Sequence, residues 1–265
     1  MTDLKKIVLL TLIAILFPGV RSGFAARYIF DDEFNGNALS SSWIALNVYD
    51  NVNNERQCYV PSQITVKDGY LNSTAIAQKT ICSNMIKSFA SGAVVWAPPL
   101  SFKYGTVEYR AKFAGGKGTW PAIWLLGTDC QPDSAGVYNA KTCDWPHAGS
   151  NEIDITEVKF SNFIRPWQNV INPDGFWTTC QPHVSDVSQN FHKYAFTWTP
   201  HRLTWYIDDK KTCETTDPAF IPSTPMYLII NTSVGGNGAS AIVKKSTLPQ
   251  TTKVDYIRVS PLNSN

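Results

Sequence analysis

The chain has 265 residues, of which 43% are hydrophobic and 12% aromatic, and its formal net charge at pH 7 is +2. This length allows one large β domain or two small ones. So small a net charge gives no reason to expect nucleic acid or an anionic membrane surface as a partner.

The first recognisable pattern is at the N-terminus. Lys5 and Lys6 precede an apolar run over residues 7–20, and small residues follow in "RSGFAA". This layout predicts a secretory signal peptide over residues 1–25, cleaved after Ser22 or Ala25, and hence a secreted protein with no membrane attachment after cleavage. An uncleaved membrane anchor is the alternative, but the run is short for a span of ~20 residues.

Beyond this leader, short β-rich runs recur between turn signals, without a long helical pattern, a repeat or a low-complexity linker. The predicted strands lie at residues 106–113, 194–198, 203–207, 226–234 and 254–259. Many short strands without intervening helices indicate a single all-β domain over residues 26–265. We expect a β-jelly-roll sandwich of two antiparallel sheets, with a barrel as the alternative.

The segment "GKGTWPAIWLLG", residues 116–127, has the alternation of a strand. Trp120 and Trp124 share one face with Ala122, and Ile123 and Leu125 point to the other. If the second face is core, the tryptophans line the opposite face, where flat rings that bury ~150–250 Å² each suit stacking on sugar rings. A second hydrophobic layer is the alternative.

The segment "NEIDITEVKF", residues 151–160, carries three carboxylates in a β-branched run, and its alternation reverses after Thr156. Before Thr156 the apolar residues are at odd positions, and after it Val158 and Phe160 are at even ones. A one-residue slip sends side chains to the opposite face, and one extra residue in a β-bulge near Thr156 corrects it. The predicted result is one apolar face and one face that carries Glu152, Asp154 and Glu157.

Three carboxylates so close together cannot all ionise freely, so at least one pKa should rise. A protonated acid beside an ionised nucleophile is what cleavage of a glycosidic bond requires, with the two carboxyl groups ~5–5.5 Å apart in retaining glycosidases. An acidic solvated face and a calcium site are the alternatives.

Six cysteines form an even set, which in an exported protein indicates disulfides. No Cys-x-x-Cys pair is present, which argues against a zinc site. The sequence does not choose among the fifteen pairings of six cysteines. A bridge from Cys130 to Cys143, across a turn-rich segment, is the best single prediction.

The chain resembles glycoside hydrolase family 16, in its laminarinase-like branch. "NEIDITE" is similar to the bulged E-x-D-x-x-E signature of that branch. The blocks "FDDEFNG", "NNERQCY", "FKYGTVEYRAKF", "GKGTWPAIWLLG", "LIINTSVGG" and "VDYIRV" follow in the family's order over most of residues 28–260. The resemblance implies a β-jelly-roll with an open cleft on its concave sheet.

The resemblance also implies site residues. Glu152 would be the nucleophile, Glu157 the acid/base, and Asp154 the residue that holds and tunes Glu152. The implied substrate-binding residues are Trp120, Trp124, Asn54 and Arg110, although Arg110 is equally a candidate for a structural ion pair. Glu33, Gly69 and Asp255 match positions from which many members bind a structural calcium ion, two of them through backbone oxygens. No cofactor is implied for catalysis.

The sequence departs from the branch at two places: Asn151 stands where a Gly is usual, and Asn172 is the candidate for the place of a usual His. The implied activity is a secreted, monomeric, retaining endo-β-glucanase acting on β-1,3- or mixed β-1,3-1,4-glucans. A cell-wall transglycosylase with the same residues and a non-enzymatic β-glucan-binding protein on the same fold are the alternatives.

Overall fold

A computed structural model describes residues 28–48, 52–82, 84–173, 175–239 and 243–262. The predicted signal peptide over residues 1–25 lies outside these ranges. Within them, no helix is long and apolar enough to cross a membrane.

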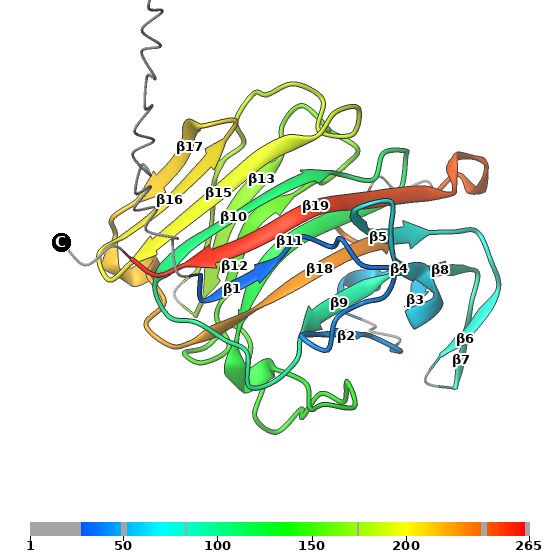
Figure 1. The fold of residues 1–265 in the computed structure, drawn as a ribbon, viewed down its shortest axis with the longest axis horizontal. Helices are drawn as coiled ribbons and strands as arrows, with labels where there is room; N and C mark the ends of the chain where they lie inside the picture. The colour runs from blue at the N-terminus through cyan, green and yellow to red at the C-terminus, as the bar shows by residue number, and fades with distance from the viewer. Residues whose placement is uncertain (1–27, 49–51, 83, 174, 240–242, 263–265) are drawn as a thin grey trace, which may run out of the picture.

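Two antiparallel sheets make up most of the described fold (Figure 1). Sheet I has the strand order β17 (Lys210–Thr215), β16 (Arg202–Ile207), β15 (His192–Thr199), β10 (Gly105–Lys112), β19 (Gln250–Ser260), β5 (Tyr70–Ala75) and β4 (Ile64–Lys67), with β1 (Phe30–Asp32) beside β19. Sheet II has the order β14 (Gly175–Cys180), β13 (Trp167–Asn172), β12 (Glu152–Glu157), β11 (Thr119–Gly127), β18 (Met226–Val234), β9 (Ala93–Trp96) and β2 (Trp43–Ala45).

Smaller elements connect the sheets. The strands β3 (Gln57–Tyr59) and β8 (Phe89–Ser91) pair in parallel, and β6 (Thr80–Cys82) forms a hairpin with β7 (Met85–Lys87). The described 3₁₀ turns are η1 (Val52–Asn54), η2 (Pro61–Gln63), η3 (Thr128–Cys130), η4 (Pro218–Phe220) and η5 (Lys245–Thr247). The predicted two-sheet sandwich is therefore confirmed, and so are the five predicted strands, with ends that differ by a few residues.

The core lies between the sheets because the strands of sheet I alternate as the sequence predicts. In β10, Val107, Tyr109 and Ala111 are fully buried, and the residues between them are only partly covered. Strand β18 is buried over its whole length, as expected for a strand covered on both faces. The two sheets are stacked in layers (Figure 1), and most of the buried apolar residues form one large cluster, with a smaller cluster around Ala75, Phe89 and Val234.

Three disulfides are present, and the predicted Cys130–Cys143 bridge is confirmed. A second joins Cys58 to Cys82. The third, Cys180–Cys213, ties β14 to β17, the edge strands of the two sheets on the same side of the sandwich. Bridges that close loops of this size typically stabilise a fold by about 2–4 kcal/mol.

The predicted β-bulge is confirmed in β12. Against β13, Asp154 is opposite Asn169 and Glu157 is opposite Trp167, so two residues of β12 face one residue of β13. Ile155 and Thr156 are both buried, and the Tyr109 hydroxyl of sheet I donates a 2.8 Å hydrogen bond to Thr156 Oγ1. The extra residue therefore points into the core, and Glu157 returns to the face of Glu152 and Asp154.

The prediction for Phe160 is wrong. Its side chain is 52% exposed, whereas Val158 is fully buried as expected. Strand β12 ends at Glu157, and Phe160 has a positive φ of 55° with its backbone N–H bonded to the Gly238 carbonyl. Strand alternation cannot extend past the point where the backbone leaves the extended conformation.

Candidate active site

A cavity of about 540 Å³ lies over the face of sheet II that is turned away from the core. Strands β11, β12 and β18 supply its floor, and residues near β3, η1 and the Cys130–Cys143 loop supply its walls. The side chains with polar atoms among the lining residues are those of Asn53, Glu55, Tyr59, Trp120, Trp124, Tyr138, Trp145, Glu152, Asp154, Glu157, Asn231 and Ser233. A cavity lined by apolar and aromatic side chains together with a few polar groups is typical of a small-molecule or sugar site.

The structure brings all three carboxylates of β12 together at this cavity. Asn169 on β13 donates from one amide nitrogen to Asp154 Oδ2 and to Glu157 Oε2, each at 2.9 Å. Trp120 Nε1 donates to Glu157 Oε1 at 2.6 Å, and Trp145 Nε1 donates to Glu152 Oε2 at 2.8 Å. Each carboxylate is therefore fixed in position by at least one neutral donor.

The environment raises the pKa of each carboxyl. Burial is the main cause for all three, and it raises the pKa of Glu152 to about 7 and those of Asp154 and Glu157 to about 8. Mutual repulsion adds to the effect, since Glu157 acts on Glu152, Glu152 on Asp154, and Asp154 on Glu157. The three groups therefore hold protons at pH values where an exposed carboxyl has lost its own.

Asp154 and Glu152 also share a side-chain hydrogen bond, which lowers the pKa of Glu152 and raises that of Asp154. Of the two carboxyls, Glu152 therefore ionises more readily than Asp154. The Asp154 backbone is held from the core side as well, where Trp205 Nε1 donates to its carbonyl oxygen at 3.1 Å. This arrangement favours an ionised Glu152 with a protonated Asp154 beside it.

The two tryptophans of β11 line the cavity, whereas Ile123 and Leu125 are fully buried in the core. Trp124 is half-buried and its Nε1 donates to Asn231 Oδ1 at 2.8 Å. Trp120 is only 9% exposed, because the Gly238 backbone packs directly on its indole, where a larger residue would clash. Trp124 consequently offers the more open ring face, and Trp120 mainly positions Glu157.

This difference leads to a prediction for Trp124→Ala in an inactive Glu152→Ala background. We expect binding of a soluble polysaccharide to weaken about tenfold or more, because a ring surface is lost from the cavity. Trp124→Phe keeps a ring and serves as the matched control. Calorimetric titration measures binding, and thermal melts test folding. A large fall in melting temperature with unchanged affinity would instead assign Trp124 to the core.

Lys159 is a site residue that the sequence interpretation missed. Its Nζ lies 2.9 Å from Glu157 Oε2, and its side chain is 14% exposed. The signal was available, because residues two apart on an extended segment share a face and Lys159 follows Glu157 by two. No sequence pattern pointed to Asn169 or Trp145. The register of β13 places Asn169 at the site, and the path of the chain after the Cys130–Cys143 loop places Trp145 there.

Two predicted substrate-binding residues lie elsewhere. Arg110 is on sheet I and forms a 2.7 Å ion pair with Asp255, so the structural role left open for it is the one observed. Asn54 is exposed next to the cavity, but its side chain bonds to Asn237 at 2.9 Å, and its neighbours Asn53 and Glu55 line the cavity instead. Asn172 ends β13, and its side chain lies outside the described part of the structure.

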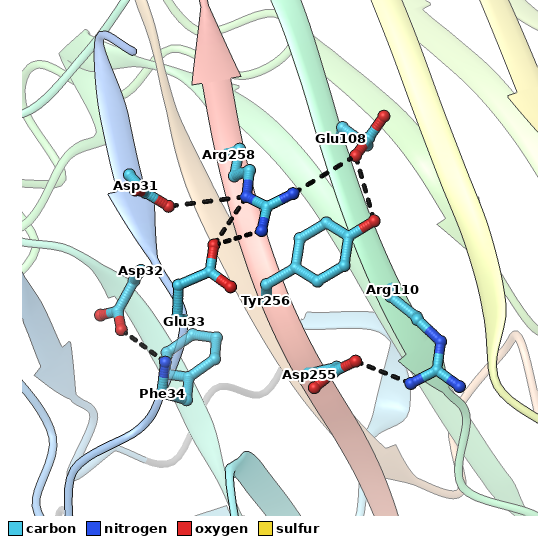
Figure 2. A network of polar contacts seen from close by, with 9 residues as sticks. All are labelled: Asp31, Asp32, Glu33, Phe34, Glu108, Arg110, Asp255, Tyr256 and Arg258. Atoms are coloured by element: carbon cyan, nitrogen blue, oxygen red, sulfur yellow. Dashed lines mark hydrogen bonds and ion pairs between the residues drawn. The ribbon is translucent and has the colours of Figure 1, made fainter. Parts of the chain in front are cut away.

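The residues predicted for calcium lie on and beside sheet I. Figure 2 shows that Glu33 points to Arg258, with Oε1 2.6 Å from the guanidinium, and that Asp255 points to Arg110. The hydrogen bond from Arg258 lowers the pKa of Glu33. Gly69, in the turn between β4 and β5, has a positive φ of 77°. In the described ranges, no group of three His, Cys, Asp or Glu residues is arranged to hold a metal ion.

The arrangement of the three carboxyls can perform acid–base and nucleophilic chemistry. A carboxyl with a raised pKa can donate a proton, and a neighbouring carboxylate held by a tryptophan and an aspartic acid can attack. The calcium alternative for the acidic strand is disfavoured, because N–H donors and a lysine already contact the carboxylate oxygens.

Comparison with known proteins adds a family match. The model of glycosyl hydrolases family 16 matches residues 53–258. The glucan endo-1,3-beta-glucosidase A1 of Niallia circulans is 30% identical over 266 residues, which cover 87% of this chain and 37% of that protein. The beta-glucanase of Rhodothermus marinus is 31% identical over 192 residues, which cover 65% of this chain and 63% of that protein. The chain thus spans less than two thirds of the length of these relatives.

Solved structures show the same fold. LamAcat from Zobellia galactanivorans has a TM-score of 0.78 at 25% identity, with 88% of this chain and 97% of that chain covered. A LamA variant from the same organism, in complex with laminaritriose and laminaritetraose, has a TM-score of 0.77 at 26% identity. The match covers 88% of this chain and 98% of that chain. SCLam, described as a non-specific endo-beta-1,3(4)-glucanase, has a TM-score of 0.74 at 26% identity, with 88% of this chain and 90% of that chain covered. The β-jelly-roll prediction is confirmed.

Proposed function

The chain belongs to glycosyl hydrolase family 16, and on that premise we propose that it is a retaining endo-β-glucanase. Its proposed substrates are β-1,3- or mixed β-1,3-1,4-glucans, which it hydrolyses by double displacement. The single observation that carries this proposal is the bulged strand β12, which puts Glu152, Asp154 and Glu157 on the cavity face with raised pKa values. The names of the relatives, which include β-1,3- and β-1,3-1,4-glucanases, support the substrate class.

In the proposed mechanism Glu157 donates its proton to the glycosidic oxygen as that bond breaks, and a Glu152 oxygen bonds to the anomeric carbon. Water then attacks the anomeric carbon, Glu157 takes a proton from it, and the bond to Glu152 breaks. Asp154 keeps Glu152 oriented and ionised through their shared hydrogen bond. The sugar ring next to the cleaved bond would stack on the rings that line the cavity.

Stereochemistry tests the mechanism. We expect the reducing ends released from laminarin or barley β-glucan to be β-anomers before mutarotation, because two displacements at one carbon retain its configuration. Proton NMR during the first minutes of hydrolysis distinguishes the anomers. Release of α-anomers first would exclude Glu152 as a nucleophile.

A substrate screen tests the activity itself. The purified protein is incubated with laminarin, barley β-glucan, lichenan, xyloglucan and agarose, and the products are sized. Oligosaccharides from the first three support the proposal, and products longer than the substrate at high oligosaccharide concentration indicate a transglycosylase. Binding of a glucan without any new reducing ends would indicate a non-enzymatic glucan-binding protein.

We also propose that the protein is secreted and acts as a monomer. Three disulfides suit an oxidising compartment. Recovery of the cleaved protein from the medium and light scattering of it test these two statements.

A structural calcium ion does not fit the predicted residues as they are arranged. The carboxylates of Glu33 and Asp255 already pair with arginines, which supply the positive charge that the ion would bring. We therefore expect the melting temperature to change by less than about 1 °C when EDTA or calcium is added. Calcium-dependent stabilisation would instead show that the ion displaces Arg110 from Asp255, and Arg110→Gln should then increase the effect.

A further inference from the structure

Lys159 follows the end of β12 by two residues, and its ammonium group lies over two tryptophan rings. Its Nζ is 5.6 Å from the ring centroid of Trp120 and 5.0 Å from that of Trp167. The faces of tryptophan rings attract cations, so both rings favour the ammonium group at this position. The same Nζ forms the 2.9 Å ion pair with Glu157 Oε2. Lys159 therefore places a positive charge in direct contact with Glu157.

Every hydrogen-bonding contact of the Glu157 carboxyl described above is with a donor. Trp120 contacts Oε1, and Asn169 and Lys159 contact Oε2. Donors stabilise the ionised carboxylate, whereas the first step of the proposed reaction needs the protonated acid. Burial and the repulsion from Asp154 act in the opposite direction and favour the protonated form. The proton affinity of Glu157 is thus a balance between these two sets of interactions.

The charged groups around Glu157 can be named by element. Strand β12 contributes Glu152 and Asp154, and Glu55 is the further carboxylate on the cavity wall. Strands β11 and β13 contribute only neutral groups at this point, Trp120, Trp167 and Asn169. Lys159 is the cation described in contact with the carboxyl, and it is therefore the group that offsets the mutual repulsion of the carboxylates.

Resting on the proposed acid/base role of Glu157, we propose that Lys159 is a positioning residue that sets the upper pH limit of the reaction. Its ammonium group holds the ionised form of Glu157 in place for the second step, in which the carboxylate takes a proton from water. It also makes proton loss from the acid easier in the first step, at the cost of activity at alkaline pH.

Removal of this charge should therefore move the pH profile. We expect Lys159→Met to raise the alkaline limb of kcat/KM by about one pH unit, because an opposite charge in contact lowers a carboxyl pKa by about 1–3 units. The substrate is whichever of laminarin, barley β-glucan and lichenan the wild type cleaves fastest. Lys159→Arg keeps the positive charge and should show the alkaline limb of the wild type. In Lys159→Met, KM should change less than kcat, because Lys159 contacts Glu157.

The matched control is Lys210→Met, which removes an exposed lysine from β17 on sheet I and should leave the profile unchanged. A merely structural role would lower kcat/KM at every pH without moving the limb. Lys159→Gln is the second variant, in case the methionine variant is unstable. If the alkaline limb of kcat/KM stays at its wild-type position in a folded Lys159→Met or Lys159→Gln protein, the proposal is overturned. Failure of both variants to fold overturns it as well.

The proposed function is tested separately, in protein that keeps Lys159. If Glu157→Ala retains full activity on glucan, the acid/base assignment fails whatever Lys159 does. If Glu157→Ala is inactive and rescued by azide while the Lys159 variants keep the wild-type limb, only the role of Lys159 is refuted.

Discussion

Glu152→Ala is expected to lose at least about 10⁴-fold in kcat on every glucan that the wild type cleaves. Removal of a nucleophile eliminates the covalent route, and comparable losses accompany loss of a nucleophile in other hydrolases. The fold should persist, because Glu152 is only half-buried and its exposed partner Trp145 is not part of the core. Reducing-end assays and thermal melts measure the two effects.

Glu157→Ala should lose activity for a different reason. Without an acid, natural glucans are cleaved slowly, but aryl glycosides whose leaving group needs no proton should still form the covalent intermediate with Glu152. Azide should then speed turnover and yield a β-glycosyl azide. Glu214→Ala, which removes an exposed carboxylate from β17, is the matched control and should behave as wild type. A β-azide product from the Glu152 variant instead would reverse the two assignments.

Insertion of one alanine after Thr156 is expected to prevent folding. The insertion would turn Glu157 into the core, where burial of an unpaired carboxylate costs several kcal/mol. It would also turn Val158, which is fully buried, outward. Together these losses are a large share of the ~5–15 kcal/mol by which a domain is stable. We expect an insoluble or inactive product, measured by circular dichroism and glucan hydrolysis.

Deletion of Thr156 is the contrasting variant. The remaining run alternates without a break, so the carboxylates stay on the cavity face. The Tyr109 hydroxyl loses its buried partner at a cost of about 1–3 kcal/mol, which corresponds to a melting temperature about 2–12 °C lower. We expect this variant to fold. A folded, active insertion together with an unfolded deletion would contradict the role of the bulge.

The sequence alone determined the features that depend on local alternation. The period-two pattern of residues 106–113 predicted a strand and its buried face, because a side chain's face in a strand depends only on its position parity. The parity reversal in residues 151–160 predicted the bulge, since the carboxylates and isoleucines could share their faces in no other regular way. The Cys130–Cys143 bridge followed from a short turn-rich segment.

Tertiary structure alone decided which chemistry surrounds the carboxylates. Asn169 contacts Asp154 and Glu157 because of the register of β13 against β12, which no pattern in either segment specifies. The contact between Arg110 and Asp255 arises because β10 pairs with β19, which places the two charges side by side on sheet I. Phe160 is exposed because β12 ends three residues earlier. Such contacts depend on residues distant in sequence, and local periodicity carries no information about them.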